Sequence, residues 1–378
     1  MRIFLIHSSG VQELPALPAQ LPPEGTLWIA CAQAAFESQI SDIQNTLHTL
    51  AGVPLVDLHI SDLLNTQLPS RYDYTAQYDL LVFRRLTTAT TQATAQQASA
   101  TLTTNAAMQR SSGPPVLRRI DTRPVGFAVF DRVLLSVHPQ DCAVRNAYAA
   151  RLLATQASEP REDRSTPWPS SRLPTSPADL MLRIINLIVD SYLELRRELT
   201  RQLDHWQDEL LKPHTRFNNW SALLDARMTL HHLDEICEDQ RAAIRDWIEA
   251  LEGWAPPNTP TGPKELDLLK VRSRDVLEHI ERVVHHVRRL EQNTETAVQM
   301  HFSVQSNRTN DIMRTLTALT AVFLPLNLIA GIFGMNFDFI PLVHKQDGFW
   351  WAMAGMTATA LALVVVFWRK RYLARSGR

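Results

Sequence analysis

The sequence has few cysteines, almost no net charge and none of the short motifs that mark the commonest enzyme classes. Its cysteines, Cys31, Cys142 and Cys237, form no C-x-x-C pair, which indicates unpaired thiols in a reducing compartment. A formal charge of -1 and a pI near 6.9 argue against a nucleic-acid partner. Because the chain has no P-loop, G-x-S-x-G, H-E-x-x-H or glycine-rich phosphate-binding loop, we expect that it is not an enzyme and needs no cofactor.

Charge is also missing from two long stretches near the end of the chain. Residues 315–337 and 348–368 contain no Asp, Glu, Lys or Arg. Each stretch has roughly the 20 residues that a helix needs to cross a hydrocarbon core of about 30 Å. A buried helix of a soluble domain usually carries polar positions at helical period on its flanks, and these stretches have almost none. The sequence therefore predicts two transmembrane helices.

Positive charge predicts how these helices are oriented, since cytoplasmic loops are enriched in Lys and Arg. The loop between the spans, residues 338–347, carries only Lys345 as a Lys or Arg, and the first apolar run of the chain, "RIFLIH", is too short for a signal peptide. We expect a protein of the cell inner (plasma) membrane with both termini in the cytoplasm. The flanking positive residues are Arg308 and Arg314 before the first span, and Arg369, Lys370, Arg371, Arg375 and Arg378 in the tail 369–378.

The first part of the chain, residues 1–156, reads as a cytoplasmic α/β domain. Short strand-like runs, "RIFLIH", "TLWIACA", "DLLVFRR", "VGFAVF" and "RVLLSVH", alternate with helical stretches near 36–51 and 58–65, and the last two runs predict a hairpin. A low-complexity insertion at 87–115 has no hydrophobic period. A polar, Pro-rich linker follows at 157–177.

Residues 178–314 show the period of long helices, which we interpret as a stalk. The last of them starts at "GP", 262–263, and contains neither Pro nor Gly until Pro325. A continuous helix from Glu265 to Asn336 would be close to 100 Å long, at about 1.5 Å per residue. Apolar residues at steps of four and three predict coiled-coil-like packing in this helix: Val276, Ile280, Val283, Val287 and Leu290.

Two spans cannot enclose a water-filled path, so a conducting protein of this kind needs several copies around an axis. The first span carries a stripe of polar and small residues at alternating steps of three and four, whereas the second has aromatic residues at both ends and reads as lipid-facing. The alternative is that the polar residues only bridge helices in a packed bundle. The stripe consists of Asn310, Met313, Thr317, Thr320, Leu324, Asn327, Gly331 and Gly334.

The stretch "GMNF", 334–337, closes the first span. In a symmetric oligomer Asn336 would form a ring of amide oxygens at the outer mouth, and Gly334 would let neighbouring backbones come close. Neutral oxygens bind the waters of hydrated Mg²⁺ without trapping the ion, as conduction requires. Asn and Gly also end helices routinely, so the motif is a weak signal on physical grounds alone.

Beyond these physical arguments, "GMNF", the short loop, the final span and the basic tail resemble the CorA family of divalent metal ion transporters. "SNRTNDIMRTLTALTAVFLPLNLIAGIFGMNF", 306–337, is similar to the pore helix of that family almost position by position, and "HISDLLN", 59–65, resembles a segment of its N-terminal domain. The resemblance implies a funnel-shaped homopentamer: an α/β domain, an α-helical stalk and a pore lined by the first span. Its partners would be membrane lipids, divalent cations and copies of itself, with no nucleic acid.

The resemblance also implies roles for single residues. Gly334, Met335 and Asn336 match the selectivity filter, and the stripe from Asn310 to Gly331 matches the pore lining and gate. Asp62 and Asp275 match two carboxylates that bind regulatory Mg²⁺ between subunits. The family would move hydrated Mg²⁺, with Co²⁺ or Ni²⁺ as further substrates, into the cytoplasm down its gradient. Mg²⁺ is then both substrate and regulatory ligand.

The outer loop departs from the pattern of magnesium-transporting relatives. It reads "FIPLVHKQD" and lacks a Glu, although Asp338 and Asp347 supply negative charge. A zinc or other transition-metal transporter of the same family is the nearest alternative, and the pairs His231-His232 and His285-His286 invite it. Adjacent histidines on a helix point about 100° apart, however, and chelate poorly. A membrane-tethered sensor or scaffold is a more distant alternative, which leaves the polar stripe unexplained.

Overall fold

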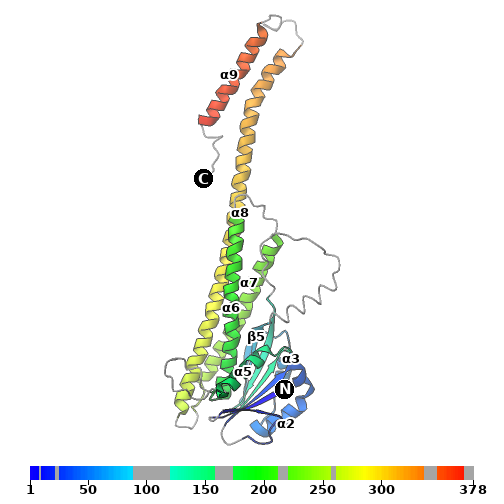
Figure 1. Cartoon of the computed structure of the whole chain (residues 1–378), viewed down its shortest axis with the longest axis vertical. Coiled ribbons are helices and arrows are strands. Elements are labelled where there is room, and N and C mark those ends of the chain that lie inside the picture. The colour runs from blue at the N-terminus through cyan, green and yellow to red at the C-terminus, as the bar shows by residue number, and fades with distance from the viewer. Residues whose placement is uncertain are drawn as a thin grey trace. The chain divides into compact units, whose positions relative to one another are not determined.

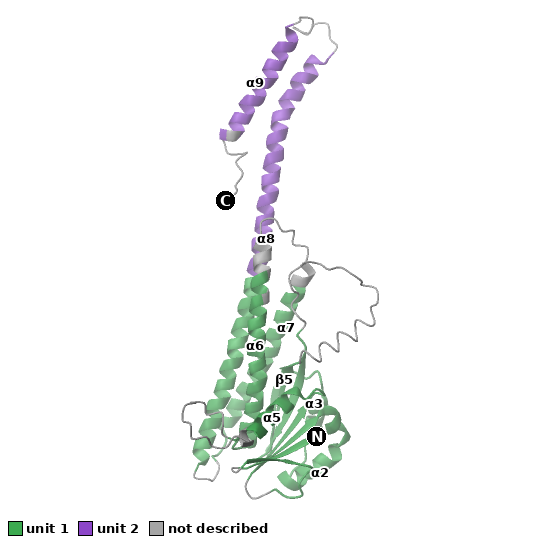
Figure 2. Cartoon of the chain, in the orientation of Figure 1, with its two compact units in different colours: residues 1–294 green, residues 295–378 purple. Residues whose placement is uncertain are grey.

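The computed structural model describes residues 1–7, 10–21, 25–87, 120–157, 173–211, 220–256, 261–335 and 347–369 (Figure 1). Most of the expected insertion at 87–115 and of the linker at 157–177 lies outside these ranges, as do Asn336 and the tail beyond Arg369. The chain divides into two compact units, residues 1–294 and 295–378 (Figure 2). Each unit is considered by itself below.

The described strands of the first unit form one seven-stranded sheet in the order β2-β1-β3-β7-β6-β5-β4. Only β3 and β7 pair in parallel, and the expected hairpin is present as the antiparallel pair β6–β7. The five predicted strands are confirmed, whereas β2 and β4 are additional short strands. The strands are β1 Arg2–His7, β2 Gly10–Leu14, β3 Thr26–Ala32, β4 Arg71–Tyr74, β5 Asp79–Leu86, β6 Thr122–Val129 and β7 Val133–His138.

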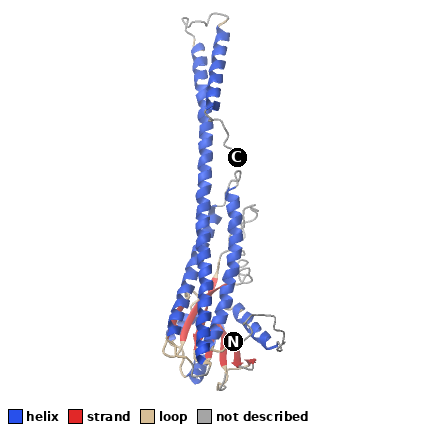
Figure 3. Cartoon of the chain, turned by 90° about the vertical axis from the view of Figure 1, so that its left-hand side faces the viewer, coloured by secondary structure: helices blue, strands red, loops and turns tan. Residues whose placement is uncertain are grey.

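Helices cover both faces of this sheet (Figure 3). Successive side chains of a strand point to opposite faces, so Leu27 and Ile29 of β3 pack in one core with α1 Gln33–Ser38, α2 Ile40–Ala51 and α3 Asp57–Leu64. Trp28, between them, stacks on Phe4 and meets the ring of Tyr148 in α5 Ala143–Ala157 on the other face. The stretch near 36–51, which the sequence predicts as helical, contains two helices in the structure, α1 and α2.

Long helices make up the rest of the first unit: α6 Pro177–Leu211, α7 Trp220–Glu252 and the first part of α8 Gly262–Phe333. Tyr192 of α6 and Gln240 of α7 both donate hydrogen bonds to the Arg84 carbonyl of β5, which ties these helices to the sheet. The five apolar positions of α8 that predicted coiled-coil-like packing are all buried, as that prediction requires: Val276, Ile280, Val283, Val287 and Leu290.

The second unit contains the rest of α8 and α9 Gly348–Arg369. Both helices are long and apolar enough to cross a membrane, and 6% and 0% of the residues in their most apolar windows are buried. A core helix of a soluble protein would be mostly buried, so these fractions favour membrane spans. The helix α8 ends at Phe333, where the Gly334 N–H bonds the Ala330 carbonyl at 2.9 Å.

Candidate functional site

The candidate pore face lies on the last part of α8. Every described member of the stripe is exposed, and the largest, Leu324, keeps 70% of its surface free. Among the described residues, no side chain of the same chain covers this face. Water or other copies of the chain can therefore contact it. The exposed members are Asn310, Met313, Thr317, Thr320, Leu324, Asn327, Gly331 and Gly334.

The two threonines of the stripe use their hydroxyl protons within the helix. Thr317 Oγ1 donates to the Met313 carbonyl at 2.7 Å, and Thr320 Oγ1 donates to the Leu316 carbonyl at 2.9 Å. This local bond satisfies the donor and lets a polar side chain exist in an apolar helix. The lone pairs of both oxygens stay available, so each threonine presents an acceptor on the exposed face.

The start of the expected filter closes the helix. A side chain at Gly334 would place its Cβ 3.1 Å from the Ala330 carbonyl oxygen, closer than most Cβ contacts, so glycine suits this tight last turn. Met335 follows with 49% of its surface exposed, and its N–H bonds the Ile332 carbonyl at 3.3 Å. Asn336, the expected selectivity residue, lies outside the described residues.

The two expected regulatory carboxylates lie in different surroundings. Asp62, in the last turn of α3, is 8% exposed, and its Oδ2 has no hydrogen bond but lies 3.7 Å from an Arg71 guanidinium nitrogen. Asp275 of α8 has a side chain that is 57% exposed and lies 3.8 Å from His279 Nε2, one turn further along. Within the described part of the chain, no three His, Cys, Asp or Glu side chains form a metal-binding group.

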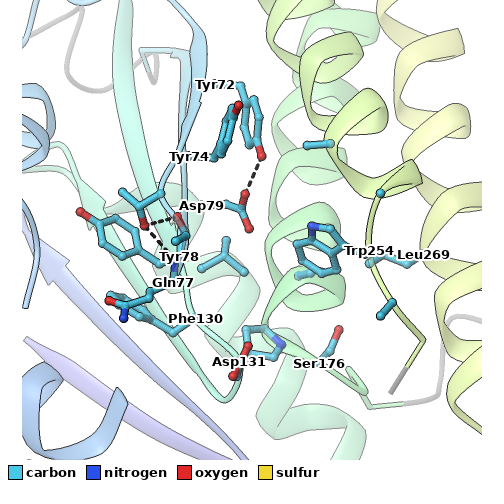
Figure 4. Close-up of a pocket in the computed structure, with 18 of the residues that line it drawn as sticks. Tyr72, Tyr74, Gln77, Tyr78, Asp79, Phe130, Asp131, Ser176, Trp254 and Leu269 are labelled. Atoms are coloured by element: carbon cyan, nitrogen blue, oxygen red, sulfur yellow. Dashed lines mark hydrogen bonds between the residues drawn. The ribbon is translucent and has the colours of Figure 1, made fainter. Parts of the chain in front are cut away.

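A cleft of about 1280 Å³ lies in the first unit, between the β4–β5 hairpin and the adjoining ends of α6, α7 and α8 (Figure 4). Tyr72 points its hydroxyl at Asp79 across 2.5 Å, and burial raises the pKa of the Asp79 carboxyl. Lys, Arg and His are missing from the described residues that line the cleft. Its carboxylates are Asp73, Asp79, Asp131, Asp246, Glu249 and Glu265.

These features define a class of protein. A large α/β domain with long helices is followed by two exposed apolar helices of membrane-spanning length, and the first of these carries a polar stripe. The class is an α-helical membrane protein with an extensive domain outside the bilayer.

Comparison with known proteins gives the family. Residues 35–371 match the family model described as "CorA-like Mg2+ transporter protein", and because the match covers most of the chain, this protein belongs to that family. The resemblance and the fold class predicted from the sequence, with its α/β domain, long helices and two apolar helices, are therefore confirmed.

Curated relatives match over part of their length. The chain is 27% identical to the cobalt/magnesium transport protein CorA of Thermotoga maritima over 194 residues, which are 51% of this chain and 52% of that protein. It is 30% identical to the magnesium transport protein CorA of Haemophilus influenzae over 152 residues, 40% of this chain and 47% of that protein. The chain thus spans about half the length of the curated relatives that it matches.

Solved structures match over nearly the whole chain. The complete structure of the CorA magnesium transporter from Methanocaldococcus jannaschii aligns with a TM-score of 0.68 at 18% identity, covering 100% of this chain and 98% of that one. The full-length CmaX protein aligns with a TM-score of 0.62 at 17% identity, covering 98% and 97%. At these identities the likeness shows a shared fold.

Proposed function

We propose that this chain forms a homopentameric, channel-like transporter that moves hydrated Mg²⁺ down its electrochemical gradient into the cytoplasm. The observation that carries the proposal is the exposed polar stripe of α8, which ends at Gly334 and Met335 directly before Asn336. Such a stripe is costly against lipid, and packing several copies around an axis would turn it toward water. Membership of the family and the magnesium and cobalt named for its relatives support the choice of ion.

The chemistry of the stripe suits a hydrated ion. Mg²⁺ gives up its waters reluctantly, and these waters present O–H donors outward. Thr317 and Thr320 offer acceptor oxygens, because their own protons are bonded to helix carbonyls. Asn327 and Asn336 add amide oxygens, and no residue of the stripe is a carboxylate. Neutral acceptors hold the hydration shell weakly enough for the ion to leave.

The membrane potential supplies the driving force in this proposal. One elementary charge gains about 2.3 kcal/mol per 100 mV, so a divalent cation gains about 4.6 kcal/mol on moving into a cell at that potential. The sequence contains no nucleotide-binding loop that would couple transport to ATP. With both termini in the cytoplasm, the ion would pass the Asn336 ring first and Asn310 last.

Feedback by intracellular Mg²⁺ is the regulatory part of the proposal. Asp275 is the exposed member of the expected pair, so its carboxylate is accessible to an ion. Carboxylates that face each other repel unless a cation lies between them, so bound Mg²⁺ would stabilise one subunit arrangement and its loss would shift the population.

The test is ion uptake by liposomes that contain the full-length protein and an internal Mg²⁺-sensitive dye. We expect Mg²⁺ uptake that grows with an inside-negative potential and falls at least about 10-fold in Asn336→Ala, which corresponds to a permeation barrier that is higher by roughly 1.4 kcal/mol. Asn293→Ala is the matched control, because Asn293 is an exposed asparagine of α8 in the other unit. Its uptake should equal that of the wild type.

Replacing Mg²⁺ by Co²⁺, Ni²⁺ or Zn²⁺ in the same liposomes tests the nearest alternative. Co²⁺ or Ni²⁺ uptake beside Mg²⁺ agrees with the proposal, since the oxygen ligands of the stripe do not select strongly among hydrated divalent ions. Uptake of Zn²⁺ without Mg²⁺ would identify a transition-metal transporter instead. Mg²⁺ uptake that is the same in Asn336→Ala and wild type would remove the filter from the proposal.

A further inference from the structure

Asp62 is an unusual place for a regulatory Mg²⁺ site. Its side chain is 10% exposed, at the end of α3, and its Oδ2 is buried without a hydrogen bond. A buried carboxylate oxygen needs a positive partner, since an unpaired charge away from water costs several kcal/mol. The partner in this chain is Arg71 of β4, whose Nη1 lies 3.7 Å away.

Arg71 connects Asp62 to a second carboxylate. Its Nη2 donates to Asp73 Oδ2 at 2.8 Å, and His59 Nε2 lies 3.5 Å from the same oxygen. Burial acts to raise the pKa of Asp73, but the Tyr74 N–H, the Arg71 guanidinium and His59 outweigh it, so the pKa is lowered and Asp73 is charged. One guanidinium therefore serves two carboxylates.

This arrangement does not fit a divalent ion. An ion bound to Asp62 Oδ2 would lie beside a guanidinium that is always protonated, and the two positive charges would repel. Hydrated Mg²⁺ keeps several of its waters, and a side chain that is 10% exposed leaves little surface for them. The charge that an ion would supply is already supplied by the protein.

We propose that Arg71 is a built-in counterion that takes the place of regulatory Mg²⁺ at Asp62. Asp62 then has no part in Mg²⁺ sensing, and Asp275 is the member of the expected pair that stays accessible to the ion. Removing Arg71 would leave the carboxylates of Asp62 and Asp73 without the cation that they share, and a divalent ion would bind there in its place. The inference rests on the proposed function only for the identity of the ion that Arg71 replaces.

Thermal unfolding of the full-length protein in detergent, in EDTA or in millimolar Mg²⁺, tests this inference without any transport assay. The Mg²⁺-induced rise in Tm should be the same in wild type and Asp62→Asn. In Arg71→Gln we expect a lower Tm in EDTA and an additional Mg²⁺-induced rise of about 5 °C. The additional rise should vanish in Arg71→Gln/Asp62→Asn, which lacks the uncovered carboxylate.

Two variants serve as controls. Arg282→Gln removes the exposed arginine that pairs with Glu278 and should show the wild-type Mg²⁺ response. Arg71→Lys keeps a positive charge beside Asp62 and should also keep the wild-type response, which separates charge from packing. If Arg71→Gln does not fold, the Mg²⁺-induced rise in Tm of Asp62→Asn, compared with that of the wild type, still tests whether Asp62 binds the ion.

A Mg²⁺ response that disappears in Asp62→Asn would overturn the inference, because Asp62 would then ligate the ion in the presence of Arg71. An unchanged Mg²⁺ response in folded Arg71→Gln would overturn it as well. Liposomes without Mg²⁺ flux would contradict the proposed function and leave these unfolding results unaffected, so the two failures are distinguishable.

Discussion

At the scale of single residues, His138 predicts how stability depends on pH. It is fully buried at the end of β7, and its Nε2 lies 2.9 Å from Ser136 Oγ. Burial, followed by the positive charges of Arg145 and Arg85, lowers its pKa to about 3. The folded protein therefore holds a neutral imidazole at pH values where the unfolded chain, with a pKa near 6.5, binds a proton.

Above about pH 6.5, His138 is neutral in the folded and the unfolded chain and costs no stability. Because its pKa in the folded state is depressed, the free energy of unfolding decreases as the pH falls from about 6.5 toward 3, where the unfolded chain binds a proton and the folded protein does not. Within that window one histidine costs about 1.4 kcal/mol per pH unit. We expect the fall in Tm between pH 7.5 and pH 5 to be shallower in His138→Gln, although this variant starts from a lower Tm. His48→Gln, at an exposed position of α2, should keep the wild-type slope, and equal slopes in all three proteins would contradict the prediction.

At the residue level, the sequence allows a prediction where a pattern repeats along one helix. The stripe from Asn310 to Gly331 was predicted from its period, and its residues are exposed in the structure, while their role as a pore lining stays a prediction. Arg71 was not found, because its role depends on where the end of α3 lies relative to β4. No local period links Asp62 to Arg71, so only the tertiary structure brings them together.

At the scale of elements, the position of α3 depends on a glycine in the sheet. A side chain at Gly126 of β6 would place its Cβ 2.2 Å from Leu63 Cδ2, so α3 packs closely where the strand has no side chain. Leu63 is 5% exposed and belongs to the core beneath this helix. Gly126→Ala should therefore overpack this contact and lower the stability by about 1–3 kcal/mol.

A double-mutant cycle measures that contact. Leu63→Ala should cost about 2–5 kcal/mol through the cavity that it leaves, and Gly126→Ala should add little in its presence, because the new methyl group has room. The measurement is the free energy of unfolding of each variant. Ala128→Gly, a change of one methyl group in the same strand, serves as the control. Additive effects of the two substitutions would show that Gly126 and Leu63 do not interact.

Element types followed from the sequence wherever apolar runs were long enough. Strands β1, β3, β5, β6 and β7 are such runs, and they were predicted. The strands β2, "GVQEL", and β4, "RYDY", are short and rich in polar residues, so their pairing partners rather than their own pattern make them strands. The break between α1 and α2 at Gln39 likewise lacks a Pro or Gly signal.

At the scale of the whole molecule, the second unit has almost no core of its own. Among its described residues, Ala297 and Ala318 are the only buried apolar side chains. In the proposed transporter, lipid and other copies would cover this exposed apolar surface, while the polar stripe would turn away from lipid. The proposed pore would thus be a property of the assembly, and a single copy would present only one wall of it.

Cysteine accessibility tests this consequence on the full-length protein in liposomes. The native thiols Cys31, Cys142 and Cys237 are buried and should react little with a water-soluble reagent, so the labelling of an introduced cysteine can be measured without removing them. Thr320→Cys lies on the stripe, and Val322→Cys lies about 200° around the same helix, at 100° per residue. A charged, water-soluble thiol reagent should modify Thr320→Cys at least about 10-fold faster than Val322→Cys, since a thiolate forms readily in water and not in lipid.

Modification should also block Mg²⁺ uptake in Thr320→Cys alone. Equal rates at the two positions would mean that the stripe packs against other helices, as in a bundle without a water-filled path, and that the ion takes another route.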